Sequence, residues 1–161
     1  MNLQGERLIA AAPEATWAAL NDPDTLKACI AGCETLERVA DDEYLATMAM
    51  RIGPVNARFK GRLKLENIVP PSSYTIAFDG QGGVAGFGKG SADVKLAPEG
   101  AGTRLSYAAK AQVGGKLAQV GSRLIEGAAS KIADDFFAAF ESRLAPAAEK
   151  AASTGTNMIT K

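Results

Sequence analysis

The side chains that most often carry out catalysis or bind metals are scarce in this sequence. Its 161 residues include no histidine, which removes the commonest general base and excludes any Ser-His-Asp or Cys-His site. The two cysteines, Cys29 and Cys33, lie four positions apart in "ACIAGCE". Two thiolates fall short of a structural zinc site, and redox pairs usually have the spacing Cys-x-x-Cys. We therefore interpret both as small, partly buried thiols and predict no metal site.

Two other patterns could carry chemistry, but neither fits its surroundings. The glycines of "GFGKG", residues 86–90, suggest a phosphate-binding loop. Such a loop, however, has four residues between its first glycine and Gly-Lys and leads into a helix, whereas these glycines lie in strand-like sequence. The acidic pairs Asp41-Asp42 and Asp134-Asp135 fit surface charge, because aspartate is mostly exposed. We predict neither a nucleotide site nor a catalytic residue.

The composition fits one domain without a strong electrostatic preference. Apolar residues make up 47% of the chain, which is enough for a core. The 18 basic and 18 acidic side chains balance, which argues against a nucleic-acid partner. No apolar run reaches the length of about 18 residues that spans a membrane, and the opening "MNLQGERLIAAAP" lacks the pattern of a signal peptide. We expect a cytoplasmic protein.

Two short helices and a series of strands are predicted to precede a long C-terminal helix. Pro13 suits the first turn of a helix, where its missing N–H would be unpaired anyway, and Asp22 can cap a second helix. From Glu34 onward apolar and polar residues alternate, as in antiparallel strands with one buried face. The predicted strands cover residues 2–10, 34–40, 43–52, 55–69, 74–83, 84–98 and 103–113, and the predicted helices cover residues 13–22, 23–30 and 116–144.

The clearest alternation lies in residues 55–69, where one face is apolar and the other is basic. Ordinary sheet alternation predicts that the basic face is simply solvated. It could also dock an acidic enzyme or an anionic lipid surface, and the sequence leaves these alternatives open. The basic residues are Arg58, Lys60, Arg62 and Lys64.

The C-terminal helix has one broad apolar face and is therefore predicted to lie across the apolar face of the sheet. Leu117, Ile125 and Phe140 belong to this face, whereas Phe137 points away from it. Gly121 also falls on it. Because glycine inside a helix costs about 1 kcal/mol relative to alanine, Gly121 suggests a gap or the close approach of a strand.

A curved sheet around a long helix, with small residues on the facing walls, tends to enclose a cavity. The same apolar pattern also fits a filled core, so both interpretations stay open. Methionine suits a wall that must adapt to a flexible ligand. The residues predicted to line the site are Met48, Met50, Phe59, Phe78, Phe87, Val120, Gly121 and Leu124.

The order of these elements resembles the START-like (SRPBCC, Bet v 1-like) helix-grip superfamily, whose members hold hydrophobic ligands between helix and sheet. Within it, the sequence is similar to the CoxG family of carbon monoxide dehydrogenase subunits over nearly all of residues 1–144. The similar stretches are "WAALNDPDTLKACIAGCE" (17–34), "RIGPVNARFKG" (51–61), "GFGKGSADVKL" (86–96) and "GTRLSYAAKAQVGGKLAQVGSRLI" (102–125). The resemblance implies an α+β fold, in which a curved antiparallel sheet of six to seven strands wraps around the long helix.

We expect the ligand-binding domain to cover residues 1–145. The tail, residues 146–161, drifts into small polar residues and is expected to be disordered.

The resemblance also implies a function. It points to a non-enzymatic accessory protein of a molybdenum-containing carbon monoxide dehydrogenase or a related hydroxylase, which links the enzyme to the membrane and its quinone pool. The implied ligand is a quinone or another lipid, with no covalently bound cofactor and with peripheral contact at the inner face of the membrane. Two alternatives remain. A START-like enzyme of the cyclase or hydrolase type would need polar groups inside the cavity, and an assembly or docking factor would have a solid interior.

Overall fold

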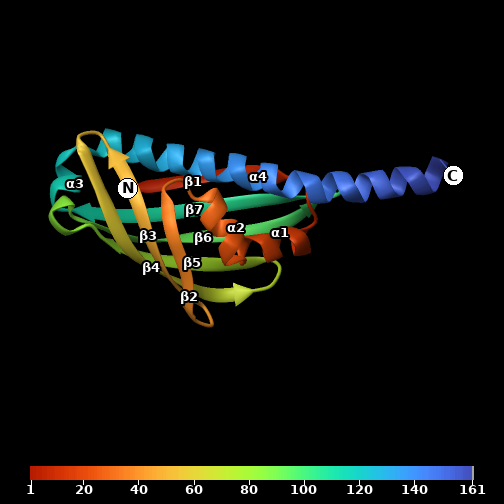
Figure 1. The fold of residues 1–161 in the computed structure, drawn as a ribbon, viewed down its shortest axis with the longest axis horizontal. Coiled ribbons are helices and arrows are strands. Elements are labelled where there is room, and N and C mark those ends of the chain that lie inside the picture. Colours follow the sequence, from red (N-terminus) through yellow and green to blue (C-terminus); the bar gives the residue numbers. More distant parts are fainter. Residues whose placement is uncertain (161) are drawn as a thin grey trace.

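Within residues 1–160, seven antiparallel strands form one sheet that curves around a long helix (Figure 1). The computed structural model describes the backbone of these residues and the side chains of residues 1–144. The strand order is β1-β7-β6-β5-β4-β3-β2, so the first two strands in the sequence are the two edges of the sheet. The elements are β1 (Asn2–Ile9), α1 (Pro13–Leu20), α2 (Pro23–Cys29), β2 (Cys33–Ala40), β3 (Glu43–Ile52), β4 (Val55–Val69), β5 (Ser73–Gln81), the short 3₁₀ helix η1 (Gly83–Ala85), β6 (Phe87–Glu99), β7 (Gly102–Gly114), α3 (Lys116–Gln119) and α4 (Ser122–Thr160). The expected α+β helix-grip fold, with two short helices after the first strand, is confirmed.

Strand β4 shows how the alternation in the sequence sorts side chains onto two faces. Phe59 is buried toward α4, on what we call the inner face, whereas Lys60 is exposed on the outer face. Paired residues in neighbouring strands share a face. The pairs Met48–Phe59 and Leu63–Phe78 therefore place these side chains together on the inner face.

The two short helices cover one end of the inner face. Both begin at a proline, as the sequence predicts. The Asp22 side chain accepts a hydrogen bond from the backbone N–H of Asp24 at 3.2 Å, which satisfies one free N–H at the start of α2. Cys29, the last residue of α2, is 3% exposed and belongs to the buried core. The short helices therefore supply core side chains where the long helix alone would leave the sheet uncovered.

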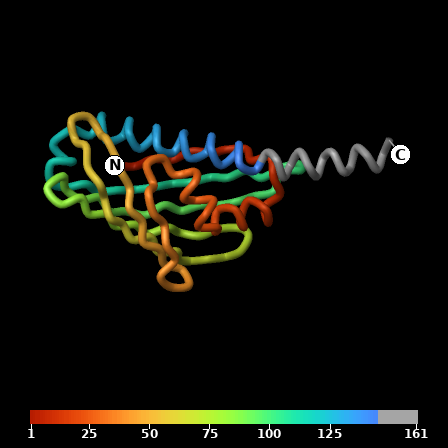
Figure 2. Tube along the Cα trace, viewed as in Figure 1, coloured from red at the N-terminus to blue at the C-terminus, as the bar shows by residue number. Residues whose placement is uncertain are grey.

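Helix α4 lies side by side with β1, although the two come from opposite ends of the described chain (Figure 2). Arg7 on β1 forms an ion pair with Asp134 on α4, and its guanidinium lies 5.3 Å from the ring centroid of Phe137. Phe137 is 8% exposed and stacks on Tyr107, with 5.4 Å between the ring centroids. The prediction that Phe137 points away from the buried face is wrong, because the edge strand β1 extends the surface that α4 covers.

The predicted continuous helix is interrupted at Gly121, which belongs to a turn. Helix α3 ends at Gln119 and α4 begins at Ser122, with Gly121 between them at φ +97°. A residue with a side chain rarely adopts this conformation, which glycine adopts freely. A Cβ on Gly121 would meet nothing within 4 Å, so the glycine is explained by its backbone conformation and not by the close approach of a strand.

The C-terminal part of α4 bears on two expectations. The predicted disordered tail, residues 146–161, lies outside the residues whose side chains are described, so its disorder remains a prediction. Within the described residues, no helix combines the length and the apolar character that crossing a membrane requires.

The buried side chains fall into two separate clusters. The large cluster joins α1, α2 and the C-terminal half of the described α4 to β1, β5, β6 and β7, and its buried members are Ile9, Leu20, Cys29, Tyr74, Val94, Leu96, Leu105, Phe137 and Phe140. The small cluster joins the start of α4 to α3, η1, β3 and β4, and its buried members are Ile52, Phe59, Ala85, Leu117 and Ile125. Helix α4 is therefore held to the sheet at two places.

The two glycines of the C-terminal helical region should respond oppositely to alanine. Gly127 is exposed inside α4, and an added Cβ would meet nothing within 4 Å. We expect Gly127→Ala to raise the free energy of unfolding by about 1 kcal/mol, the difference in helix propensity. We expect Gly121→Ala to lower it by about 1–2 kcal/mol, the strain of a left-handed residue. Urea unfolding of both variants checks this, and an equal gain in both would contradict the left-handed turn.

Candidate functional site

Helix α4 leaves the middle of the inner face partly uncovered. Its buried contacts come from Ile125 in the small cluster and from Phe137 and Phe140 in the large one. At a rise of about 1.5 Å per residue, Ile125 and Phe137 lie about 18 Å apart along the helix. Between them Ile132 is only partly buried, and it belongs to neither cluster. The two clusters therefore hold α4 to the sheet at two places. The segment of α4 between them has no fully buried side chain in either cluster, and we call it the span.

The part of the sheet beneath this span is apolar and partly exposed to solvent. We call it the open stretch. Its members are on the inner face by pairing register, are neither fully buried nor fully exposed, and belong to neither cluster. Those used below are Met48, Gly61, Leu63, Phe78, Gly80 and Gly88. An apolar surface of this kind at the centre of a fold is unusual, because it would normally be packed.

Three glycines form the floor of the open stretch. The register pairs Gly61 with Gly80 and Gly80 with Gly88, so they lie in one row across β4, β5 and β6. A Cβ on Gly80 would meet its nearest atom at 3.8 Å, and a Cβ on Gly88 would also do so at 3.8 Å. These are ordinary contacts, so the absence of side chains here leaves space above the sheet and is not enforced by crowding.

Two other glycines close to this row make room for aromatic rings. The Phe59 ring occupies the place where a Cβ on Gly82 would be. A Cβ on Gly90 would lie close to the backbone oxygen of Lys110, and the tip of the Phe78 ring lies 2.9 Å from the same position. Each ring is therefore laid over a neighbouring glycine, away from the row formed by Gly61, Gly80 and Gly88.

Seven of the eight residues predicted to line the site divide among three places, and the eighth, Phe87, lies on the outer face. Met48 and Phe78 lie in the open stretch. Met50, Phe59 and Val120 pack in the small cluster, at one end of it. Leu124 and Gly121 lie at the surface beyond that cluster, where Leu124 is 50% exposed. The eight residues are therefore not brought together as a single wall.

The placement of Phe87 on the inner face is corrected by the strand register. Phe87 pairs with Gly114 and Gln81. It lies an even number of positions from Lys89 and Asp93 along β6, so it shares the outer face with them. Its ring covers Gly114 from that side. Alternation counted along β6 alone could not show this, because the glycines on either side give no indication of which face is buried.

The prediction missed Leu63, Ile132 and the glycine row. Leu63 and Ile132 were assigned to apolar faces by their periodicity, but periodicity cannot separate a residue in a packed cluster from one in a gap. The glycine row is invisible in the linear sequence, because Gly61, Gly80 and Gly88 become neighbours only through strand pairing.

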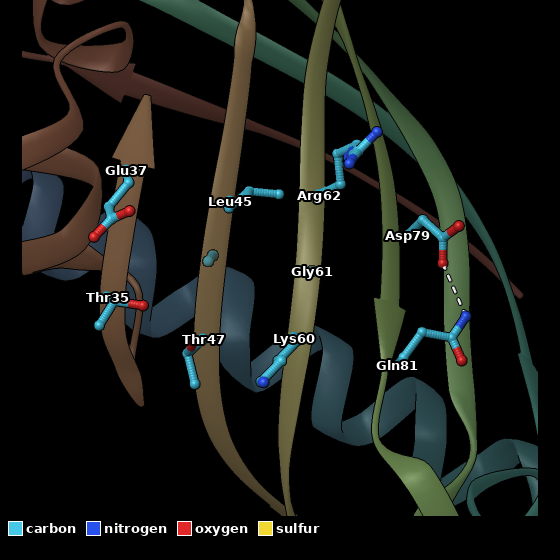
Figure 3. Close-up of a pocket in the computed structure, with 10 residues that line it drawn as sticks. Thr35, Glu37, Leu45, Thr47, Lys60, Gly61, Arg62, Asp79 and Gln81 are labelled. Atoms are coloured by element: carbon cyan, nitrogen blue, oxygen red, sulfur yellow. Dashed lines mark hydrogen bonds between the residues drawn. The ribbon is translucent and has the colours of Figure 1, made fainter. Parts of the chain in front are cut away.

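An open hollow with mixed charges lies on the outer face of β2 to β5 (Figure 3). Its volume is about 560 Å³, and Glu37, Lys60, Arg62 and Asp79 are among the residues that line it. A second hollow, lined in part by residues of β5, β6 and β7, also opens on the outer face. Neither lies between α4 and the sheet, so the binding space predicted there rests on the open stretch.

The basic face of β4 is partly neutralised. Arg58 pairs with Glu34 at 3.0 Å, and Arg62 pairs with Glu43 at 3.3 Å. Both arginine side chains are largely exposed, so these ion pairs contribute little to stability. Their neighbour Lys60 forms no ion pair with the described side chains. Whether this face is merely solvated or binds a partner stays a prediction.

Three titratable groups near the inner face, Tyr74, Cys29 and Cys33, have raised pKa values. Burial raises the pKa of Tyr74 well above its ordinary value of 10.0, and the nearby Tyr44 raises it further. Burial also raises the pKa values of the Cys29 and Cys33 thiols above 9.0. A raised pKa leaves a smaller fraction of a phenol or a thiol in the anionic, nucleophilic form at neutral pH. Within the described residues, no three potential metal-ligating side chains gather into a group.

Tyr74 should make stability fall at alkaline pH. The folded state keeps the phenol protonated above pH 10, where the unfolded chain releases the proton, so stability is lost as the pH rises above that value. We expect the free energy of unfolding of Tyr74→Phe to fall less between pH 9 and pH 11 than that of the wild type, as measured by urea unfolding. Identical pH profiles for the two proteins would contradict the assignment.

Comparison with known proteins places this geometry in a family. Residues 5–145 match CoxG, a family of carbon monoxide dehydrogenase subunits. The chain belongs to this family. A conserved protein from Geobacillus kaustophilus, whose crystal structure is known, is similar at 32% sequence identity with a TM-score of 0.86. The match covers 91% of this chain and 96% of that one. The family resemblance seen in the sequence is thereby confirmed.

More distant structures share the fold alone. TTHA0849 from Thermus thermophilus has 18% identity and a TM-score of 0.68, over 91% of this chain and 99% of that one. Ara h 8.0201 has 14% identity and a TM-score of 0.63, over 91% of this chain and 98% of that one. No curated protein matches this CoxG family member. The helix-grip architecture therefore extends well beyond the family, whereas the family itself carries the functional information.

Proposed function

We propose that this chain is a non-enzymatic accessory protein of a molybdenum-containing carbon monoxide dehydrogenase or a related hydroxylase. In this proposal it holds a quinone or another lipid between α4 and the open stretch. It thereby links the enzyme to the quinone pool of the membrane. Membership of the CoxG family supports the accessory role.

The observation that carries the proposal is the partly exposed apolar middle of the inner face, which belongs to neither buried cluster. The open stretch presents Met48, Leu63 and Phe78 around the glycine row, while α4 spans it at a distance set by the two clusters. An apolar chain placed there would gain about 0.8 kcal/mol for each CH₂ removed from water. Met48 adds an adaptable wall, because its unbranched side chain can rearrange around different guests.

The chemistry of the surrounding side chains supports a binding role over catalysis. Arg7, the charged residue on the inner face of β1, is already engaged by Asp134 and lies over the Phe137 ring. The raised pKa of Tyr74 keeps its phenol protonated at neutral pH, within the large cluster. These groups therefore serve packing and charge pairing, and the open stretch itself is apolar.

Native mass spectrometry of the chain purified from its own host, followed by lipid extraction, tests the proposal. We expect a quinone or another lipid bound at near one-to-one occupancy. A protein that is empty when purified and also fails to bind added menaquinone or ubiquinone would contradict the proposal.

Filling the glycine row should abolish binding without unfolding the protein. The Cβ of Gly80→Leu would make only ordinary contacts, and the rest of the side chain would project into the space beneath α4. We expect occupancy by added menaquinone to fall at least about tenfold, since steric exclusion removes burial worth more than about 1.4 kcal/mol.

The matched control is Gly127→Leu, which adds the same side chain to the exposed side of α4 where nothing lies within 4 Å. It should bind menaquinone like the wild type. Circular dichroism and urea unfolding verify that both variants are folded. Undiminished binding by a folded Gly80→Leu variant would place the ligand elsewhere.

A second candidate function, an assembly or docking factor without a ligand, is favoured by the hollow on the outer face. Glu37, Lys60, Arg62 and Asp79 give it charges of both signs (Figure 3), which suit a polar segment of a partner protein. Reversing two of its charges in Lys60→Glu with Arg62→Glu should weaken capture of the hydroxylase if this function holds. Capture that survives this change, together with a bound lipid, would favour the carrier function.

A further inference from the structure

Several loops from distant parts of the sequence meet at the end of the molecule that holds α3 (Figure 1, left). We call this end the tip and define it as residues 51–56, 82–89 and 113–124. The Leu124 side chain comes within 3.3 Å of the Cβ position on Gly53, in the turn between β3 and β4. The backbones of Gly86 and Gly115 are also close, since a Cβ on Gly115 would lie 2.7 Å from the Gly86 Cα. These contacts join the three segments into one surface.

The tip exposes apolar side chains that the small cluster beneath it does not use. Val84, in the middle of η1, is 85% exposed, and Leu124, near the start of α4, is 50% exposed. Their neighbours Ala85 and Ile125 are buried in the small cluster. The short elements at the tip therefore direct one apolar residue inward and the next one outward.

The tip is also positively charged, although the whole chain is neutral with 18 basic and 18 acidic residues. Its three segments contain four basic side chains and no carboxylate, and the acidic residue that strand pairing brings beside them is Asp79, the register partner of Lys89. Among the described side chains, none of the four forms an ion pair, which is also true of Lys60 and Lys95, whereas Arg7, Arg58, Arg62 and Arg104 each form at least one. The four are Arg51, Lys89, Lys116 and Arg123.

We propose that the tip docks onto a bilayer containing anionic lipids. Exposed Val84 and Leu124 would enter the boundary between headgroups and acyl chains, and the four cations would contact the negative headgroups around them. Exposed apolar residues ringed by free cations are the combination that such a surface selects. An acidic protein surface would pair with the cations, but it would not explain why the apolar side chain of Val84 is 85% exposed.

Docking at the tip would bring the bilayer next to the open stretch. The small cluster, to which the tip residues Ile52, Ala85 and Leu117 contribute, separates the exposed surface of the tip from the open stretch. This orientation gives a lipid a short apolar route between membrane and binding site. That step rests on the proposed function, whereas docking itself does not.

The test is flotation of the full chain with vesicles. One set contains equal parts phosphatidylglycerol and phosphatidylcholine, and the other contains phosphatidylcholine alone. We expect binding to the anionic vesicles that decreases as salt is raised, because screening weakens the contacts of the cations with the headgroups. Val84→Asp, and separately Lys116→Glu with Arg123→Glu, should each weaken this binding by about tenfold.

The controls are an equivalent apolar substitution and a single charge reversal at the other end of the sheet. Val69, the last residue of β4, is 56% exposed, and Lys95 on β6 is exposed without an ion pair among the described side chains. Val69→Asp and Lys95→Glu should leave vesicle binding unchanged. All the substituted positions are exposed, so the variants should fold.

Loss of binding in the tip variants alone supports the proposal. Absent binding by the wild type, or equal loss in Val84→Asp and Val69→Asp, overturns it. Occupancy by menaquinone, measured separately by native mass spectrometry, shows whether the proposed function stands or fails independently of docking.

Discussion

The packing of α4 against the sheet at two separated clusters is the constraint on which the rest of this structure depends. A sheet with one apolar face must be covered, and in the described residues α4 is the longest element available to cover it. Because α4 is anchored by Ile125 at one end and by Phe137 and Phe140 at the other, its height above the middle of the sheet is set by those contacts. The side chains in the middle therefore need not fill the space beneath it.

The glycine row leaves a strip of the sheet beneath this span without side chains. Larger side chains at Gly61, Gly80 and Gly88 would grow into the space beneath α4, and the sheet would lose its partly exposed apolar floor. Glycine weakens a strand, so the long ladders of β4, β5 and β6 must supply the stability that the row gives up. The two anchoring clusters and the continuous sheet together stabilise a fold in which this row of glycines is locally unfavourable.

The charged side chains at the tip differ from those in the rest of the molecule. The ion pairs of Arg7, Arg62 and Arg104 tie strands to helix or to one another, away from the tip. The cations of the tip have no such partners among the described side chains. Because a chain with no net charge has little long-range field, this local separation of charge is what distinguishes one end of the molecule from the other.

The sequence by itself determined the faces of the strands, the two short helices and the family. Alternation in β4 and the prolines at Pro13 and Pro23 act locally, so they could be recognised without any partner strand. The absence of histidine likewise excluded whole classes of catalytic site. Met48 and Phe78 were placed on the correct face for the same local reason.

Only the tertiary structure decided which apolar residues are packed and which face open space. The row of Gly61, Gly80 and Gly88 exists through strand register, which depends on pairing between segments distant in the sequence. Phe87 was misplaced because the glycines on either side of it do not indicate which face of the strand is buried. Phe137 was misplaced because the edge strand β1 widens the surface that α4 covers, where Phe137 stacks on Tyr107. Gly121 was misinterpreted because the sequence does not show the φ angle of a glycine. A glycine inside a helix and a glycine in a left-handed turn therefore look identical in the sequence.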